Sequence, residues 1–292
     1  MKRVGVVTDS HSGITQKQAK EMGIFVLPMP FSINGKDYLE DVTLSRDEFL
    51  EKLAAGADVS TSQPSPSDVT GIWNRALTEF EEIVYIPISS GLSGSCMTAM
   101  ALSAGKSYRN RVFVVDNGRV STPMRRSVMD ALEMVREGYR ATQIKEMLEA
   151  AKARMQIYIA VDTLEYLRKG GRISRATATI GTVMNIKPVL KFDIGSLDTY
   201  KKCRGFVQAK KTMLEAMRQD LETVYAKQWE KGEVYLLAAS SAPDDVTAAW
   251  VKEIEAAFPG MDVLCDNLAL GISCHTGPNG LGIGCSCRPE RI

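Results

Sequence analysis

The chain lacks the features that would tie it to a charged partner or to a membrane. Its 292 residues carry 36 basic and 35 acidic side chains, a formal net charge of +1, so the basic excess typical of nucleic-acid-binding proteins is missing. No apolar stretch approaches the roughly 20 residues that span a bilayer. The apolar run after Lys2 and Arg3 is too short for the hydrophobic region of a signal peptide and is soon interrupted by Asp9, so we expect no signal peptide. We therefore expect a cytoplasmic protein without an integral membrane segment.

Cysteine and histidine are also scarce. Six cysteines in a chain of this length do not suggest the dense disulfide framework of a small secreted domain. Cys285 and Cys287, with Cys274 nearby, lack the spacing of a zinc knuckle, and no second cysteine pair or histidine cluster accompanies them. The two histidines are His11 and His275. These counts favour free thiols over a metal site, and neither a metal nor another cofactor is expected.

What the chain does contain is a regular alternation of apolar runs and helical patterns. Hydrophobic residues make up 45% and charged residues 24%, as in globular proteins. Val4–Thr8, Ile83–Ile88 and Val112–Val115 predict buried strands, each followed by a helical pattern. This alternation and the length predict two α/β domains, each a mixed or mostly parallel sheet with flanking helices. We place them at residues 1–155 and 156–292.

Local signals predict several element boundaries. The Asn34–Gly35 pair predicts a tight turn after a single strand over Ile24–Phe31. Ser45 and Glu48 predict a capping box at the start of a helix, and residues from Arg125 to Met155 read as one helical stretch. Further expected elements are strands over Ile157–Val161, Glu233–Ala239, Val263–Leu268 and Leu281–Cys285, a hairpin joining Ile186–Phe192 to Leu197–Cys203, a helix whose apolar face comprises Val207, Leu214, Met217, Leu221 and Val224, and a helix over Asp244–Phe258.

Small hydroxyl residues and glycines gather in three segments where strands should end, namely Thr8–Ser10, Thr61–Ser65 and Ser89–Ser95. Ligands of open α/β sheets bind beyond the carboxyl ends of the strands. The third segment precedes an expected helix, so its backbone N–H groups and the Ser93 hydroxyl could hold one carboxylate or phosphate. Ser93 and Ser95 could equally be simple helix caps. The segment is neither a P-loop nor a nucleophile elbow.

Two further groups of residues have both a structural and a functional interpretation. His275 lies in a glycine-flanked loop, where it is either a structural residue or a donor to a carboxylate. Arg168–Gly171 is typical of a helix end. Arg172, Arg175 and Arg204 are either a solvated surface or a docking patch for an acidic partner.

Taken in order, the polar segments resemble the DegV family. They are Val-Val-Thr-Asp-Ser at 6–10, Thr-Ser-Gln-Pro-Ser at 61–65, Ile-Ser-Ser-Gly-Leu-Ser-Gly at 88–94, Leu-Glu-Tyr-Leu-Arg-Lys-Gly-Gly-Arg-Ile-Ser at 164–174, Asn-Ile-Lys-Pro-Val-Leu at 185–190 and His-Thr-Gly-Pro at 275–278. The resemblance implies that one long-chain fatty acid lies buried between two α/β domains. It implies that Thr61 and Ser93 bind the carboxylate, with Ser62, Gly94 and His275 close by.

The resemblance also implies a partner. In that family the protein presents its fatty acid to a separate fatty acid kinase, and Arg172 and Arg204 match arginines associated with the hand-over. The chain would then be a carrier rather than an enzyme. It departs from the common pattern at His11-Ser12-Gly13, at Cys96-Met97 and at Asn279.

Three alternatives remain open at this point. The first is a phosphoryl-transfer enzyme related to dihydroxyacetone kinase, although the sequence has no nucleotide-binding loop and no evident metal-binding carboxylate cluster. The second is a hydrolase that uses Ser93, His275 and Asp9, which requires a geometry that sequence cannot supply. The third is a scaffold that holds a lipid incidentally.

Overall fold

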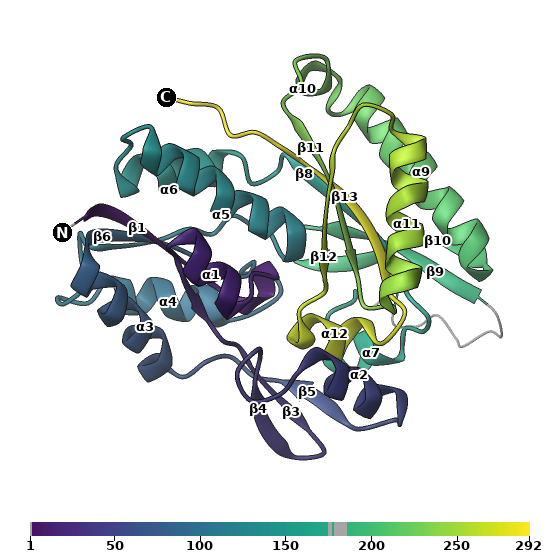
Figure 1. Ribbon diagram of the computed structural model, residues 1–292, viewed down its shortest axis with the longest axis horizontal. Helices are drawn as coiled ribbons and strands as arrows, with labels where there is room; N and C mark the ends of the chain where they lie inside the picture. The colour runs from purple at the N-terminus through teal and green to yellow at the C-terminus, as the bar shows by residue number, and fades with distance from the viewer. Residues whose placement is uncertain (1, 175–176, 178–185) are drawn as a thin grey trace.

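A computed structural model of the chain describes residues 2–174, 177 and 186–292 (Figure 1). Four parallel strands form its first sheet, in the spatial order β2-β1-β6-β7. These strands are β1 (Lys2–Asp9), β2 (Phe25–Leu27), β6 (Phe80–Ile86) and β7 (Val112–Val114). One face is covered by α3 (Pro66–Glu79) and α4 (Ser95–Ser103), and the other by α1 (Gln16–Met22), α5 (Ser121–Arg136) and α6 (Ala141–Ala150). The strands predicted over Val4–Thr8, Ile83–Ile88 and Val112–Val115 are confirmed as β1, β6 and β7.

The second sheet has six strands in the order β10-β9-β8-β13-β11-β12. They are β8 (Met155–Ala160), β9 (Ile186–Asp193), β10 (Ser196–Arg204), β11 (Val234–Ser240), β12 (Val263–Asn267) and β13 (Leu281–Cys287). Only β11 and β12 pair in parallel, so the sheet is mixed. Helices α9 (Gly205–Thr223) and α11 (Asp244–Ala257) cover one face, and α10 (Ala226–Glu230) follows α9. The predicted α/β fold class is confirmed, while the domain boundary near residue 155 stays a prediction.

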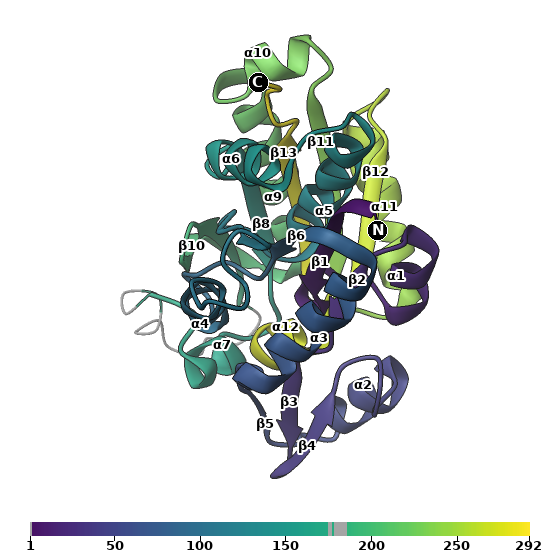
Figure 2. The same cartoon turned by 90° about the vertical axis from the view of Figure 1, so that its left-hand side faces the viewer.

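A third, three-stranded sheet projects from the first (Figure 2). It consists of β3 (Pro30–Ile33), β4 (Lys36–Leu39) and β5 (Val59–Thr61), with α2 (Arg46–Ala54) beside it. The predicted turn at Asn34–Gly35 joins β3 to β4, with φ of 51° and 78°, and the predicted Ser45–Glu48 capping box starts α2. The predicted single strand over Ile24–Phe31 is wrong. Pro28 lacks the N–H that a continuous strand needs, so the run splits into β2 and β3 of different sheets.

Two helical predictions also need correction. The stretch from Arg125 to Met155 is broken at Gly138, whose φ of 91° ends the first helix and separates α5 from α6. Met217 and Leu221 are buried as predicted on the apolar face of α9, whereas Val207 and Val224, the residue after the helix, are 83% and 65% exposed. The rest of the buried stripe is Ala209, Met213 and Ala216. None of the helices in the described ranges has the length and apolar character needed to cross a bilayer.

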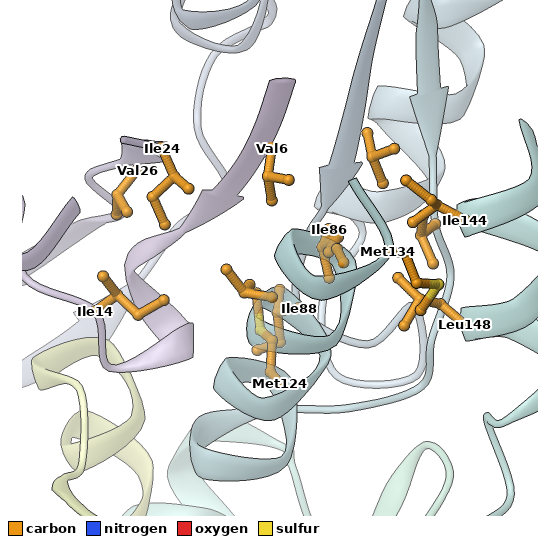
Figure 3. Packing of buried hydrophobic residues seen from close by; sticks show 14 of the residues in the cluster. Val6, Ile14, Ile24, Val26, Ile86, Ile88, Met124, Met134, Ile144 and Leu148 are labelled. Atoms are coloured by element: carbon orange, nitrogen blue, oxygen red, sulfur yellow. The ribbon is translucent and has the colours of Figure 1, made fainter. Parts of the chain in front are cut away.

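Helix α5 packs against both large sheets (Figures 1 and 2). Toward the first sheet it contributes Met124 to a core that also contains Val6 and Ile86 (Figure 3). Toward the second sheet, Nη1 of Arg125 lies 2.8 Å from Oδ1 of Asp266 on β12. The helix is therefore the layer that the two sheets share.

Arg119 fastens the segment before α5 to the second sheet. Its side chain is fully buried, and Nη1 donates to the hydroxyls of Ser127 and Ser286 at 3.0 and 2.8 Å. Nη2 donates to the Ala151 carbonyl at 2.9 Å. Burial lowers the pKa of this guanidinium, which the charge of Asp130 partly offsets. A buried cation held by three hydrogen bonds is costly to disturb, because its partners lose their donors with it.

We expect Arg119→Ala to lower the free energy of unfolding by about 3 kcal/mol, since it removes three buried hydrogen bonds and leaves a cavity. Urea titration of the purified variant measures this change. Arg109→Ala is the control, because Arg109 is exposed and its replacement should change stability by less than about 0.5 kcal/mol. Equal effects of the two substitutions would contradict the anchoring role of Arg119.

Candidate ligand-binding site

A cavity of about 290 Å³ lies between α5 and the second sheet. Its floor is mostly apolar and comes from the face of the sheet that α9 and α11 leave free. Ile157 and Ile159 on β8 and Phe192 on β9 contribute side chains to this floor. The volume is close to the lower limit of small-molecule sites, and the apolar lining suits a hydrocarbon ligand.

Two glycines on β13 leave room for this cavity. Leu281, Ile283 and Cys285 point into the core under α9 and α11, so alternation along the strand turns Gly282 and Gly284 to the cavity side. A Cβ at Gly284 would lie only 2.9 Å from the Gln156 carbonyl oxygen. Because these two positions of a central strand carry no side chains, space remains between the second sheet and α5.

The polar end of the cavity brings together all five residues predicted to hold a carboxylate. Thr61, Ser62, Ser93, Gly94 and His275 all line it. They come from the end of β5, the loop after it, the loop between β6 and α4, and α12 (Leu270–Thr276). Ser62 and Gly94 are exposed, so this end of the cavity reaches the protein surface.

His275 and Thr61 are joined directly. The Nε2 atom of His275 lies 2.8 Å from Oγ1 of Thr61. His275 belongs to the short helix α12, so its predicted placement in a loop is wrong. Gly170 at the end of α7 (Glu165–Gly170) allows this position, because a Cβ there would lie 2.0 Å from Nδ1 of His275. That Nδ1 is buried and has no hydrogen-bond partner within the described residues.

The imidazole of His275 is uncharged near neutral pH. Burial lowers its pKa to about 4, and the positive charge of Arg172 acts in the same direction. A neutral ring can donate one hydrogen bond without adding a charge to the cavity. His275 is therefore suited to orienting the Thr61 hydroxyl rather than to forming an ion pair.

The loop before α4 combines a helix cap with a free donor. Gly94 is the N-cap residue and offers no side chain, while the Ser95 N–H donates to Oγ of Ser93 at 3.3 Å. Neither Ser93 nor Ser95 is the cap residue of α4, so the simple capping interpretation is wrong. Ser93 Oγ accepts from the Ser95 N–H, and its own O–H has no acceptor among the described residues, which leaves it available to a ligand. Gln63 bridges the two polar loops, because its Oε1 accepts from Thr98 at 3.3 Å and lies against Gly94.

The two arginines predicted for docking lie in different places. Arg172 lines the cavity; its Nε donates to the Leu92 carbonyl at 3.3 Å and its Nη1 donates to the Gly170 carbonyl. Arg204 is exposed at the far end of β10. Ile173 bridges to Leu197 near the start of that strand, so roughly 20 Å of strand separates the two arginines. They do not form one patch, and Arg175 lies outside the described residues.

Asp9 does not complete a catalytic triad. Its Oδ2 accepts from the Ile88 N–H at 2.8 Å, and its Oδ1 lies 3.3 Å from Nδ1 of His11. His275, the base that a hydrolase would need, has no carboxylate partner on Nδ1 within the described residues. The geometry that the hydrolase alternative requires is therefore not present among Ser93, His275 and Asp9.

The cysteines considered for metal binding lie apart from one another. Cys285 and Cys287 are buried in the core under α9 and α11, whereas Cys274 packs with Phe31 and Phe49 near the small sheet. Burial raises the pKa of Cys274 to about 12. In the part of the chain that the structure describes, no group of three or more His, Cys, Asp or Glu side chains could hold a metal ion.

Fold and cavity together define an α/β protein that encloses an apolar space with a hydroxyl-lined polar end. The chain belongs to the DegV family, a family of uncharacterised proteins whose model matches residues 3–287. A DegV domain-containing protein of Deinococcus radiodurans is 31% identical over 281 residues, covering 96% of this chain and 97% of the relative.

Solved structures give the same assignment. A fatty-acid-binding DegV family protein from Thermus thermophilus matches with a TM-score of 0.85 and 30% identity, over 98% of this chain and 99% of that one. A stearic-acid-binding protein from Eubacterium ventriosum matches with a TM-score of 0.86 over 98% of each chain, and its 21% identity shows the fold alone.

A larger side chain on the cavity floor should raise the free energy of unfolding and lower ligand binding at the same time. Ala239 on β11 lines the cavity, whereas its neighbour Ala238 points into the packed core under α11. We expect Ala239→Leu to stabilise the lipid-free protein by about 1 kcal/mol while lowering the amount of bound apolar ligand. Ala238→Leu adds the same volume to the packed side and should destabilise by about 1–3 kcal/mol. Urea titration and extraction of bound lipid measure both effects, and equal destabilisation would argue against the cavity.

The low pKa of His275 predicts a pH-dependent loss of stability. Unfolded histidine takes up a proton below about pH 6.5, while folded His275 does not until about pH 4, so stability falls as pH falls through this window. From pH 7.5 to pH 5, wild type should lose about 2 kcal/mol relative to His275→Gln. Urea titrations of both proteins at the two pH values give this difference. A difference that is independent of pH would show that His275 titrates normally in the folded protein.

Proposed function

We propose that the protein binds one long-chain fatty acid in this cavity and acts as a carrier, without catalysing a reaction itself. The observation that carries the proposal is a single apolar space whose one polar end gathers Thr61, Ser93 and His275 from three separate segments. A carboxylate at that end can accept from the hydroxyls of Thr61 and Ser93 and from the backbone of Gly94. Ser62 and His275 complete its surroundings. The fatty-acid binding described for the Thermus thermophilus relative supports the same ligand class.

The expected energetics assign different tasks to the two ends of the ligand. Burial of roughly 15 methylenes contributes on the order of 12 kcal/mol, of which association costs of about 4–15 kcal/mol consume much. Each hydrogen bond to the carboxylate adds about 1.5–3 kcal/mol. The alkyl chain thus supplies most of the affinity, and the polar end fixes which way the ligand points.

We further propose that the protein presents the carboxylate to a separate fatty acid kinase in the cytoplasm. The polar end reaches the surface beside Ser62 and Gly94, where a second protein could reach it. Exposed Arg204 is proposed to contact that kinase. Arg172 is proposed to act at the cavity mouth, since its guanidinium is bound to the Leu92 and Gly170 carbonyls beside His275.

Native mass spectrometry of the purified protein tests the carrier proposal. We expect a co-purifying mass equal to one fatty acid, and acyl phosphate only after a fatty acid kinase and ATP are added. Turnover of ATP by the isolated chain would favour the phosphoryl-transfer alternative instead. A lipid that no kinase can use would favour the scaffold alternative.

Ser93→Ala should weaken fatty-acid binding about tenfold, because it removes one hydrogen bond to a charged group. It should reduce acyl phosphate formation more strongly, because the carboxylate is no longer held in one orientation. Ser95→Ala is the matched control two residues further on, since the Ser95 hydroxyl is buried, has no partner in the described ranges and does not line the cavity. Isothermal titration and a coupled kinase assay measure both. If Ser93→Ala behaves like the control in both assays, Ser93 does not bind the carboxylate.

A further inference from the structure

The first turn of α5 presents polar groups to the interior of the cavity. Ser121 and Thr122 line it and are only 7% and 3% exposed. Neither hydroxyl has a hydrogen-bond partner within the described residues. The N-cap residue Val120 has no side-chain oxygen, so this helix of 16 residues begins without a side-chain cap. Its first N–H groups and these hydroxyls therefore lie beside a cavity whose floor is mostly apolar.

His11 adds a third polar group to the same region. It is 7% exposed, lines the cavity and lies in the short 3-10 helix η1 (Ser10–Ser12), which packs against α5. Its Nδ1 is 3.3 Å from Oδ1 of Asp9 but lacks hydrogen-bond geometry. Its ring lies against Gly271 of α12, where a Cβ would be 2.7 Å from Nε2. We call His11, Ser121 and Thr122 the inner polar site.

The inner polar site is distinct from the polar end that holds Thr61 and His275. Gly271 precedes His275 by four residues on α12, so the contact of His11 with α12 lies about one helical turn, roughly 6 Å, from His275. A carboxylate held between Thr61 and Ser93 would therefore leave the inner polar site beside the first part of the alkyl chain.

A saturated chain would match the inner polar site poorly. Methylene groups would cover the two hydroxyls without offering them a partner, and an unmatched buried hydroxyl costs free energy. The backbone adds to this cost, because Ser121 has a φ of 57°, which a residue other than glycine seldom adopts. A hydroxyl on the chain could both donate to and accept from Ser121 and Thr122, and it could accept from the first N–H groups of α5.

We propose that the inner polar site selects fatty acids that carry a hydroxyl group in the half of the chain nearest the carboxylate. The inference rests on the proposed function, because it takes the carboxylate to be held at Thr61 and Ser93. It goes further by naming a class of ligand and a residue, Thr122, that distinguishes this class from plain fatty acids.

Isothermal titration with hexadecanoic acid and with its 3-, 5-, 7- and 16-hydroxy derivatives tests the inference. We expect at least one of the 3-, 5- and 7-hydroxy acids to bind about three to ten times more tightly than the plain acid, and the 16-hydroxy acid to show no gain. Thr122→Val keeps the side-chain shape and removes the hydroxyl, so it should abolish this ratio. Ser121→Ala should reduce it.

Thr212→Val is the matched control, because Thr212 is a buried threonine on α9 in the core on the other side of the second sheet. This variant should keep the wild-type ratio. Thermal unfolding of each variant establishes that it is folded before the ratios are compared.

Each other outcome is decisive. If the plain acid binds as tightly as every hydroxy acid, the inference is overturned and the proposed function stands. If Thr122→Val weakened the binding of plain and hydroxylated acids equally, the carboxylate itself would lie at the inner polar site. That result would also overturn the inference. Failure of every acid to bind would overturn the proposed function together with the inference.

Discussion

The double packing of α5 is the contact on which the cavity depends. One side of the helix contributes Met124 to the core of the parallel sheet, and Arg125 pairs with Asp266 of the mixed sheet. A helix held from both sides fixes the spacing of the two sheets, since buried side chains pack closely and resist compression. The free volume then remains where the mixed sheet has small residues, at Gly282 and Gly284. The cavity is therefore a consequence of the way α5 holds the two large sheets apart.

At the polar end, one hydrogen bond organises the remaining groups. His275 is neutral, and its Nε2 meets the Thr61 hydroxyl at 2.8 Å. If Nε2 carries the proton, it donates to Thr61, whose own hydrogen is then directed to an incoming carboxylate. The bare Nδ1 lies against Gly170, where the described residues offer it no donor. The closeness of Gly170 thus matters as much as the chemistry of the imidazole, because any side chain there would displace the ring.

Sequence patterns predicted the parts of this structure that local interactions determine. The turn at Asn34–Gly35, the cap at Ser45 and the start of α4 follow from short-range chemistry, and each was predicted where it occurs. α12 was missed, because seven residues containing two hydroxyls and a glycine carry no helical periodicity. The composition of the polar loops that meet at the cavity mouth predicts them, but neither the position of Arg172 in the cavity lining nor the role of Gly282 in forming the floor has a local signal. Both depend on contacts between distant segments.

The cavity is a region where local preference and tertiary structure conflict. At the starts of α2 and α3 the two agree, because capping boxes predicted by short-range chemistry begin both helices. Around the cavity they conflict: Ser121 has a positive φ, Thr122 has an unmatched hydroxyl among the described residues, and His275 is held neutral by burial. Such conflicts persist in folded proteins chiefly where function requires them. If the cavity were only a packing defect between α5 and the second sheet, the protein would be more stable with valine at position 122 and a larger residue at position 239. The polar groups that interrupt the apolar lining are therefore the part of the site that a plain hydrocarbon-binding tunnel does not account for.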